Sequence, residues 1–367
     1  MKVLMMQVQP VKAYPVQQPV QNVVAVDMNS FMVLNAVQRV SVKQLGALGE
    51  AVTCGAYPNS YLISDYNRMY QPMRNNKPYG DPLPYPMFFV KEQAKPGCCN
   101  DEFCMRVCCA PQHSSLLKFY HATDPKPQPP MACCGCTLSE RPDESSQVPG
   151  QPAFMTIERI GLCSKLPNCF VCFDCCRDEL RLHNGDIGQA GDAGSLPEDN
   201  MIGRGIVPIG GGGCTPTVQL MQRNGPGEEN ESQIGVVEGP MFFGGCYDLF
   251  CDTKFKISRD KGKAGDIGTI SKRSPKSCGD FCKQVCSTAD TYDMDITPGS
   301  TTLNPLQKAL LIGELIHLDF MFFDRDQSLV KCEKQGSTTT CTVLLCFCYC
   351  FGCLLPCKCC LQSSDQN

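Results

Sequence analysis

Cysteine is the residue type with the widest chemical potential in this chain, and it is concentrated in clusters. The sequence holds 29 cysteines among 367 residues. Clustered reduced thiols bind zinc, carry acyl chains or pack as small apolar side chains. The opening residues, MKVLMMQVQPVKAYP, lack the continuous apolar stretch and the cleavage site of a signal peptide. We therefore expect a cytosolic chain whose thiols are mostly reduced.

The cluster CSKLPNCFVCFDCC leaves several chemistries open. Its candidate residues for lipidation are Cys169, Cys172, Cys175 and Cys176. Phe170 and Phe173 lie among them, and thiols beside aromatic side chains suit acylation at a membrane surface. The three-residue spacing is also typical of zinc ligands, and the cysteine pairs at 98–99 and 108–109 would complete a four-ligand site. Simple packing or surface thiols are the remaining interpretation.

The C-terminal segment, residues 328–367, is a second cysteine-rich region. Its apolar run Val343–Leu355 has 13 residues, which is too short to span a bilayer but long enough to enter its interface. We expect this tail to be a membrane anchor, with Cys357, Cys359 and Cys360 as lipidation candidates. The alternative is a tail that binds soft metal ions through Cys353, Cys357 and Cys359.

One long helix is predicted over residues 306–323, with Asn304 as its cap and Pro305 in its first turn. It is apolar nearly all round, so it must be buried in protein or in lipid. Glu314, His317 and Asp319 interrupt it, and we favour burial in a protein core. The residues expected in that core or in a membrane are Leu310, Leu311, Ile312, Leu315, Ile316, Phe320, Phe322 and Phe323.

The rest of the chain predicts many short strands separated by Gly, Pro and Asn turns. We divide it into a short Pro- and Gln-rich disordered arm (1–30), a β domain that includes the helix (31–327) and the tail (328–367). The composition, 43% hydrophobic and 19% charged, is that of a globular protein. A net charge of −4 predicts no general attraction to nucleic acid, so anionic lipids would need local basic patches such as SKRSPK.

Catalysis by a nucleophilic side chain is poorly supported. The chain has four histidines, and its glycine-rich stretch GRGIVPIGGGG lacks the lysine of a phosphate-binding loop. We therefore expect no covalent chemistry and assign no catalytic residues.

The order of landmarks resembles the phospholipid scramblase family, whose fold is similar to the tubby C-terminal domain. The segments that carry the resemblance are VKQLGALGEAVTCGAYPNSYLISD, the paired cysteines between 98 and 109, TIERIGLCSKLPNCFVCFDCC, EGPMFFGGCYDLFCDTKFKI, GTISK and KALLIGELIHLDFMFFD. They cover most of residues 40–324. The resemblance implies a mainly β fold, a closed antiparallel barrel of about twelve strands around a central apolar C-terminal helix.

The resemblance also implies a function: ATP-independent, calcium-stimulated movement of phospholipids between leaflets, at the cytoplasmic face of the plasma membrane. Its partners would be a phospholipid membrane and anionic lipids, with no specific nucleic acid and no protein partner that the sequence identifies. The cluster from Cys169 to Cys176 matches the family's S-acylated cysteines in position. Two alternatives remain, a phosphoinositide-binding membrane adaptor and a structural protein stabilised by zinc at its cysteine clusters.

The segment ADTYDMDI occupies the place of the family's calcium motif, just before the helix. Asp290 matches that motif best, and Asp293 and Asp295 would add carboxylate oxygens, which Ca²⁺ prefers. The segment also reads as an alternating strand, with Tyr292, Met294 and Ile296 inward and the aspartates in water.

Overall fold

The structure is a computed structural model, and it describes most of the chain between residues 28 and 364. The described residues are 28–45, 59–71, 73–74, 77–78, 82–93, 114–122, 131–133, 136–138, 151–160, 177–189, 192–225, 230–263, 265–276, 281, 290–323, 329–335 and 338–364.

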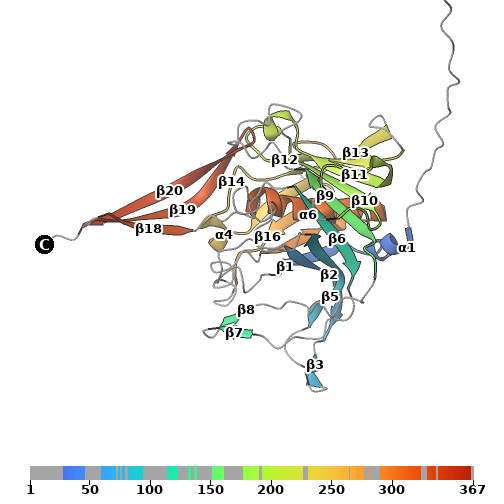
Figure 1. The fold of residues 1–367 in the computed structure, drawn as a ribbon, viewed down its shortest axis with the longest axis horizontal. Helices are drawn as coiled ribbons and strands as arrows, with labels where there is room; N and C mark the ends of the chain where they lie inside the picture. The colour runs from blue at the N-terminus through green and yellow to red at the C-terminus, as the bar shows by residue number, and fades with distance from the viewer. Residues whose placement is uncertain are drawn as a thin grey trace, which may run out of the picture.

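Twelve antiparallel strands form a closed barrel (Figure 1). In chain order they are β1 (Arg39–Gln44), β2 (Ser60–Tyr70), β5 (Leu83–Gln93), β6 (Ser115–His121), β9 (Met155–Ile160), β10 (Glu179–Asn184), β11 (Met201–Ile206), β12 (Thr217–Arg223), β13 (Glu231–Glu238), β15 (Thr253–Ser258), β16 (Gly268–Lys272) and β17 (Thr291–Asp295). Neighbours in the chain are mostly neighbours in the barrel, and β1 closes it by pairing with both β2 and β17. The predicted mainly β barrel of about twelve strands is confirmed.

Several short helices and strands accompany the twelve barrel strands. The short helices are α1 (Met28–Phe31), η1 (Met32–Leu34), η4 (Glu198–Asn200), η5 (Ile209–Gly212), α4 (Tyr247–Phe250) and η7 (Thr297–Gly299). The short strands are β3 (Met73–Arg74), β4 (Lys77–Pro78), β7 (Met131–Cys133), β8 (Cys136–Leu138) and β14 (Phe242–Phe243).

Helix α6 (Pro305–Leu318) runs through the barrel and continues as one π-helical stretch, η8 (Asp319–Phe323). Asn304 caps it: its side chain accepts the Gln307 backbone N–H at 2.9 Å, and the Gln307 side chain accepts the Asn304 N–H at 3.0 Å. Every side chain from Lys308 to Phe322 is buried, and Phe323 is partly buried. The predicted cap and the predicted burial of the helix in a protein core are confirmed.

None of the helices in the described part of the chain is long and apolar enough to cross a membrane. The barrel wall supplies the apolar surroundings that this helix requires. Inward-facing side chains alternate with outward ones along each strand, as in β15, where Phe255 and Ile257 are buried and Lys254 and Lys256 are exposed.

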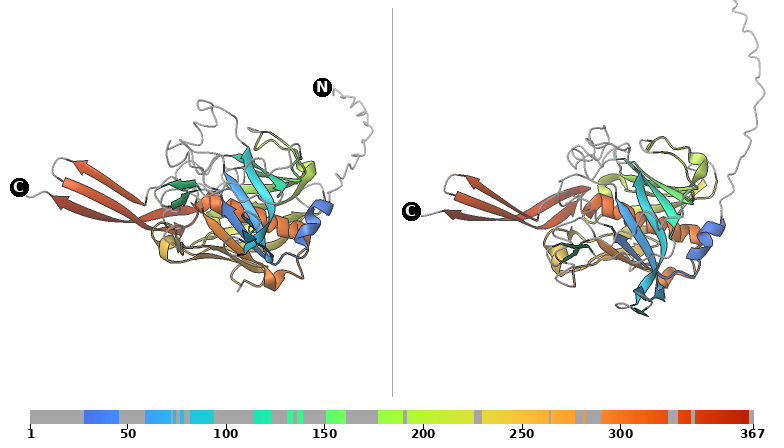
Figure 2. Two further views of the ribbon diagram at one scale, coloured as in Figure 1. Left: turned by 90° about the horizontal axis from the view of Figure 1, so that it is seen from below. Right: turned by 60° about the horizontal axis from the view of Figure 1, so that its bottom comes forward.

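The tail forms an antiparallel sheet of β18 (Val330–Gln335), β19 (Thr338–Cys350) and β20 (Cys353–Ser364). A two-residue turn at Phe351 and Gly352 joins β19 to β20, and both residues have positive φ angles, 47° and 81°. The outer half of this sheet projects away from the barrel in Figures 1 and 2. Its inner half joins the barrel core, through Leu344, Phe347, Tyr349 and Leu354.

The inner end of the tail is integrated with the barrel. Strand β14 pairs with β19, so that Phe242 lies opposite Cys348 and Phe243 opposite Phe347. The turn between β19 and β20 contacts the glycine-rich loop: the Phe351 N–H donates to the Gly213 carbonyl at 2.8 Å, and the Tyr349 hydroxyl donates to the Gly211 carbonyl at 2.7 Å.

The tight contact between helix and wall predicts the effect of one added methyl group. A Cβ at Gly203 of β11 would lie 2.6 Å from the Met221 carbonyl oxygen and 3.2 Å from the Leu310 side chain. We expect Gly203→Ala to destabilise the fold by about 1–3 kcal/mol, as overpacking does. Gly225→Ala is the control, since its nearest contact would be an ordinary 3.4 Å. Equal melting temperatures for the two variants would contradict the close packing.

Candidate functional site

A buried ionic cluster joins α6 to the barrel wall. The Asp178 carboxylate accepts from the Arg159 Nη2 at 2.6 Å, and His317 Nε2 lies 3.0 Å from the same carboxylate. His317 Nδ1 lies 3.3 Å from a Glu314 oxygen. Burial alone would raise the pKa of Asp178, but Arg159 and His317 hold it well below its ordinary value. Two of the polar residues that interrupt the helix are therefore partnered inside the barrel.

Two further clusters of polar side chains lie near the C-terminal end of the helix. Asp319 accepts hydrogen bonds from the hydroxyls of Tyr61, at 2.7 Å, and of Tyr292. The Lys272 Nζ lies 2.8 Å from Asp290 and 3.1 Å from Asp248. Burial alone would lower the pKa of Lys272, but these two carboxylates raise it, so the ammonium group stays charged.

The three aspartates predicted to bind calcium do not converge. Asp290 lies on the barrel's inner side against Lys272, whereas Asp293 and Asp295 occupy alternate outward positions of β17. Asp293 pairs with Arg273, and Asp295 lies 3.4 Å from Arg39.

The alternating-strand interpretation of the same segment is confirmed for Tyr292, Met294 and Ile296, which are buried, but Asp290 is buried too and does not lie in water as that interpretation placed it. In the described ranges no three acidic, histidine or cysteine side chains are arranged to hold a metal ion. Calcium binding stays a prediction, and in the arrangement seen here each carboxylate already has a basic partner.

The cysteines Cys169, Cys172, Cys175 and Cys176 lie outside the described residues, as do those from Cys98 to Cys109. Their lipidation or zinc binding stays a prediction. The tail cysteines Cys357, Cys359 and Cys360 are described, and they are distributed over two faces of the tail sheet.

One face of the β19–β20 hairpin is lined by thiols, and we call it the thiol face. Directly opposed residues share a face, and the register pairs Cys346 with Cys357 and Cys350 with Cys353. The members of the thiol face are Cys346, Cys348, Cys350, Cys353, Leu355, Cys357 and Cys359. The opposite face carries the buried Leu344, Phe347, Tyr349 and Leu354, together with the exposed Cys360 in the outer half.

Two thiols of this face are less acidic than an ordinary cysteine. Burial and the nearby Cys357 raise the pKa of Cys346, and burial and the nearby Cys214 raise that of Cys350. These thiols are therefore protonated at neutral pH, which makes them poor nucleophiles without an enzyme that activates them. On β18 and β19, Cys332 and Cys341 form a disulfide.

Exposed apolar side chains surround the thiol face. Phe242 is 49% exposed, Phe351 62% and Leu355 55%. Contiguous apolar surface of this kind is unusual for a monomer and is typical of a site that meets another molecule or a membrane.

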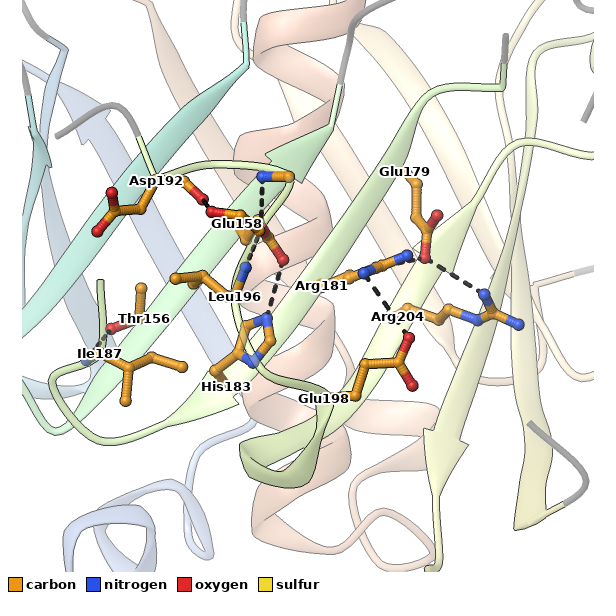
Figure 3. A network of polar contacts seen from close by, with 12 residues as sticks. Thr156, Glu158, Glu179, Arg181, His183, Ile187, Asp192, Leu196, Glu198 and Arg204 are labelled. Atoms are coloured by element: carbon orange, nitrogen blue, oxygen red, sulfur yellow. Dashed lines mark hydrogen bonds and ion pairs between the residues drawn. The ribbon is translucent and has the colours of Figure 1, made fainter. Parts of the chain in front are cut away.

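Sequence analysis missed a polar network on the outer wall, shown in Figure 3. The Glu158 carboxylate accepts the Gly194 N–H at 2.6 Å and the Leu196 N–H at 3.3 Å, and His183 Nε2 lies 3.2 Å from it. Burial would raise the pKa of Glu158, but His183 and these N–H groups lower it overall. Glu158 thus fastens the long insert after His183 against β9 and β10.

Beside this network, Arg181 and Arg204 share Glu179 on neighbouring strands, at 2.9 and 3.3 Å. No local motif in the sequence signals this network, because its contacts, apart from the Arg181–Glu179 pair within β10, join residues from different strands or loops. The network is best explained as structural support for the barrel wall and its insert.

Comparison with protein-family models, curated proteins and solved structures found no match to this chain. The closed barrel with its C-terminal helix is compatible with a tubby-like fold.

The buried cluster predicts a pH dependence of stability. Burial alone would lower the pKa of His317, but Glu314 and Asp178 raise it to about 9. Because the folded pKa exceeds the unfolded value of about 6.5, the stabilisation is complete below pH ~6.5 and disappears as the pH rises through about 9. The free energy of unfolding should fall by up to about 3 kcal/mol across this window.

The matched variant is His317→Gln, which removes the titrating group. Denaturant unfolding from pH 6 to 10 should show that the difference between wild type and variant shrinks as the pH rises. Parallel pH profiles would contradict a charged His317 in the folded protein.

Proposed function

We propose that this protein is a membrane-attached protein of the phospholipid scramblase type, which promotes ATP-independent, calcium-stimulated movement of phospholipids from the cytoplasmic face of the plasma membrane. The observation that carries the proposal is a closed twelve-stranded barrel around a sealed apolar helix, the fold that the sequence resemblance implied. The activity itself comes from that resemblance and involves no covalent chemistry on the lipid.

In this proposal, the tail attaches the protein to the membrane. Helix α6 is enclosed by the barrel, so its apolar surface is not available to lipid. The thiol face presents partly exposed cysteines beside exposed apolar side chains, and Cys359 and Cys360 are exposed. Acyl chains on two or more of these thiols would make a firm anchor, since each buried CH₂ contributes ~0.8 kcal/mol.

The filled interior constrains how lipid would move. Side chains of α6 and of the strands pack together in one continuous core. A headgroup that crosses ~30 Å of hydrocarbon would therefore move along the outside of the protein and not through the barrel.

The same filled interior favours a second candidate, a lipid- or phosphoinositide-binding adaptor that brings partners to a membrane without moving lipid. A third candidate, a structural protein stabilised by zinc, rests on cysteines outside the described residues. Metal analysis of protein purified without added zinc tests it, and a stoichiometry near zero removes it.

Vesicle assays separate the first two candidates. Purified protein is reconstituted with vesicles that contain a fluorescent phospholipid, and the label in the outer leaflet is measured with and without calcium. Faster movement with calcium supports scrambling. Vesicle binding without faster movement supports the adaptor and removes the scramblase assignment.

The tail anchor gives a separate prediction. We expect the triple variant Cys353→Ser, Cys357→Ser, Cys359→Ser to reduce the membrane-bound fraction in cells roughly tenfold, because loss of acyl chains converts firm attachment into reversible binding. Cys214→Ser is the control, since this exposed thiol lies near Cys350 of the thiol face but belongs to the loop before β12 and not to the tail. Acyl-exchange mass mapping identifies the modified cysteines, and unmodified tail cysteines in membrane-bound protein would refute this anchor.

A further inference from the structure

An apolar projection stands beside the tail, at the end of the barrel from which the tail extends. It consists of α4 and the following residue, Tyr247–Cys251, and we call it the α4 projection. Phe250 is 79% exposed, more than any other large apolar side chain in the described ranges, and Tyr247 is 41% exposed. Cys251 is also exposed. A single exposed Phe is ordinary, but this one shares a short helix with the exposed Tyr247.

The base of the projection is fixed by buried polar contacts. Asp248 is buried, and its Oδ1 accepts the Gly244 N–H at 2.9 Å and the Thr253 hydroxyl at 2.6 Å. Its Oδ2 lies 3.1 Å from the buried Lys272. The Cys246 N–H donates to the Leu344 carbonyl of β19 at 3.0 Å. Phe250 therefore projects from a rigid base and not from a loose loop.

Lysines surround the projection. Lys254 and Lys256 point outward from β15, and Lys276 is exposed after β16. Within the described part of the chain, none of these three lysines forms an ion pair with a carboxylate. Asp252, an acidic side chain near Lys254 and Lys276, accepts the Ser274 N–H and hydroxyl, both at 2.8 Å. Those hydrogen bonds, with Lys276 and Lys254, lower the pKa of Asp252.

Glu238 of β13 lies opposite Lys256, so three cations and two anions leave this surface with a small net positive charge, in a chain whose net charge is −4. An apolar tip ringed by lysines is complementary to an anionic lipid surface, where the tip enters the acyl boundary and the lysines meet phosphate and carboxylate headgroups.

The projection is also continuous with the tail. Phe242 lies opposite Cys348 of the thiol face, and the backbone of Cys246 contacts β19. Figure 2 shows α4 on the same end of the barrel as β18–β20, with α1 at the opposite end.

We propose that the α4 projection is a membrane-insertion site for anionic phospholipid bilayers, in which Phe250 enters the leaflet and Lys254, Lys256 and Lys276 contact the headgroups. The proposal deepens the proposed membrane attachment and rests on it, but it requires no acyl chain. It assigns first contact to the projection and lasting attachment to the acylated thiol face.

The sequence contains no tryptophan, so Phe250→Trp places a single tryptophan, which can be excited selectively over the tyrosines, in the full-length chain. Unacylated protein is mixed with vesicles of phosphatidylcholine, with and without phosphatidylserine. We expect a blue shift and quenching by brominated lipid with phosphatidylserine, and neither with phosphatidylcholine alone. Met32→Trp is the control, since Met32 is 51% exposed on η1, which directly follows α1 at the other end of the barrel.

Charge reversal tests the lysines. Each lysine near an anionic surface strengthens binding about fivefold, so Lys254→Glu with Lys256→Glu should weaken vesicle binding at least ~25-fold. The matched control is Lys261→Glu with Lys263→Glu, which makes the same change in charge at exposed positions beyond the other end of β15. Unchanged melting temperatures confirm that the variants fold.

Two results would overturn the proposal: no spectral change at Phe250→Trp with anionic vesicles, or equal loss of binding in the two charge-reversal pairs. If these occur while acylated protein from cells stays membrane-bound, the insertion site fails and the proposed attachment stands. If the protein is absent from membranes in cells and also fails to bind anionic vesicles, both fail.

Discussion

Helix α6 is apolar on every side, and yet it carries charged groups that have no access to water. A helix of this kind is stable only where its surroundings supply both apolar contact and specific polar partners. The barrel supplies both. Strands that are far apart in the sequence bring Arg159, Asp178 and Tyr61 to the positions where His317 and Asp319 need them. The closed sheet, in turn, has its interior filled by the helix.

Buried polar pairing also supports the α4 projection and the thiol face at the surface. Lys272 neutralises Asp290 beside the strand that precedes the helix and Asp248 at the base of the α4 projection. One buried cation thus links the strand that leads into the helix with the surface at which we place membrane contact. Phe243 continues this link, because its ring packs against Phe322 and Phe323 while its neighbour Phe242 faces solvent beside the thiol face. The surface features are therefore built directly on the core.

Much of the barrel could be predicted from the sequence, because alternating strands and one uniformly apolar helix are local patterns. The tail illustrates the limit. The run TVLLCFCYCFGCLLPCKCC is apolar on average, but it alternates between thiols on one side and Phe347 and Tyr349 on the other, with a two-residue turn at Phe351 and Gly352. Treating cysteine as one more apolar residue hides that alternation. The partners of the calcium candidates were not predictable for a different reason: Arg39, Lys272 and Arg273 reach them through strand pairing and not through sequence proximity.

The attachment of the tail has a mechanical consequence. The inner part of β19 is held by its pairing with β14, by side chains in the core and by a few hydrogen bonds to neighbouring loops, such as that from the Cys246 N–H to the Leu344 carbonyl. The outer part of the tail sheet projects from the barrel and ends near the C-terminus. A force along the strand axis would load all of these contacts at once. A force across the strands would break them one after another, which takes far less force. A bilayer that holds the tail would therefore transmit tension to the barrel in one direction and release it in the other.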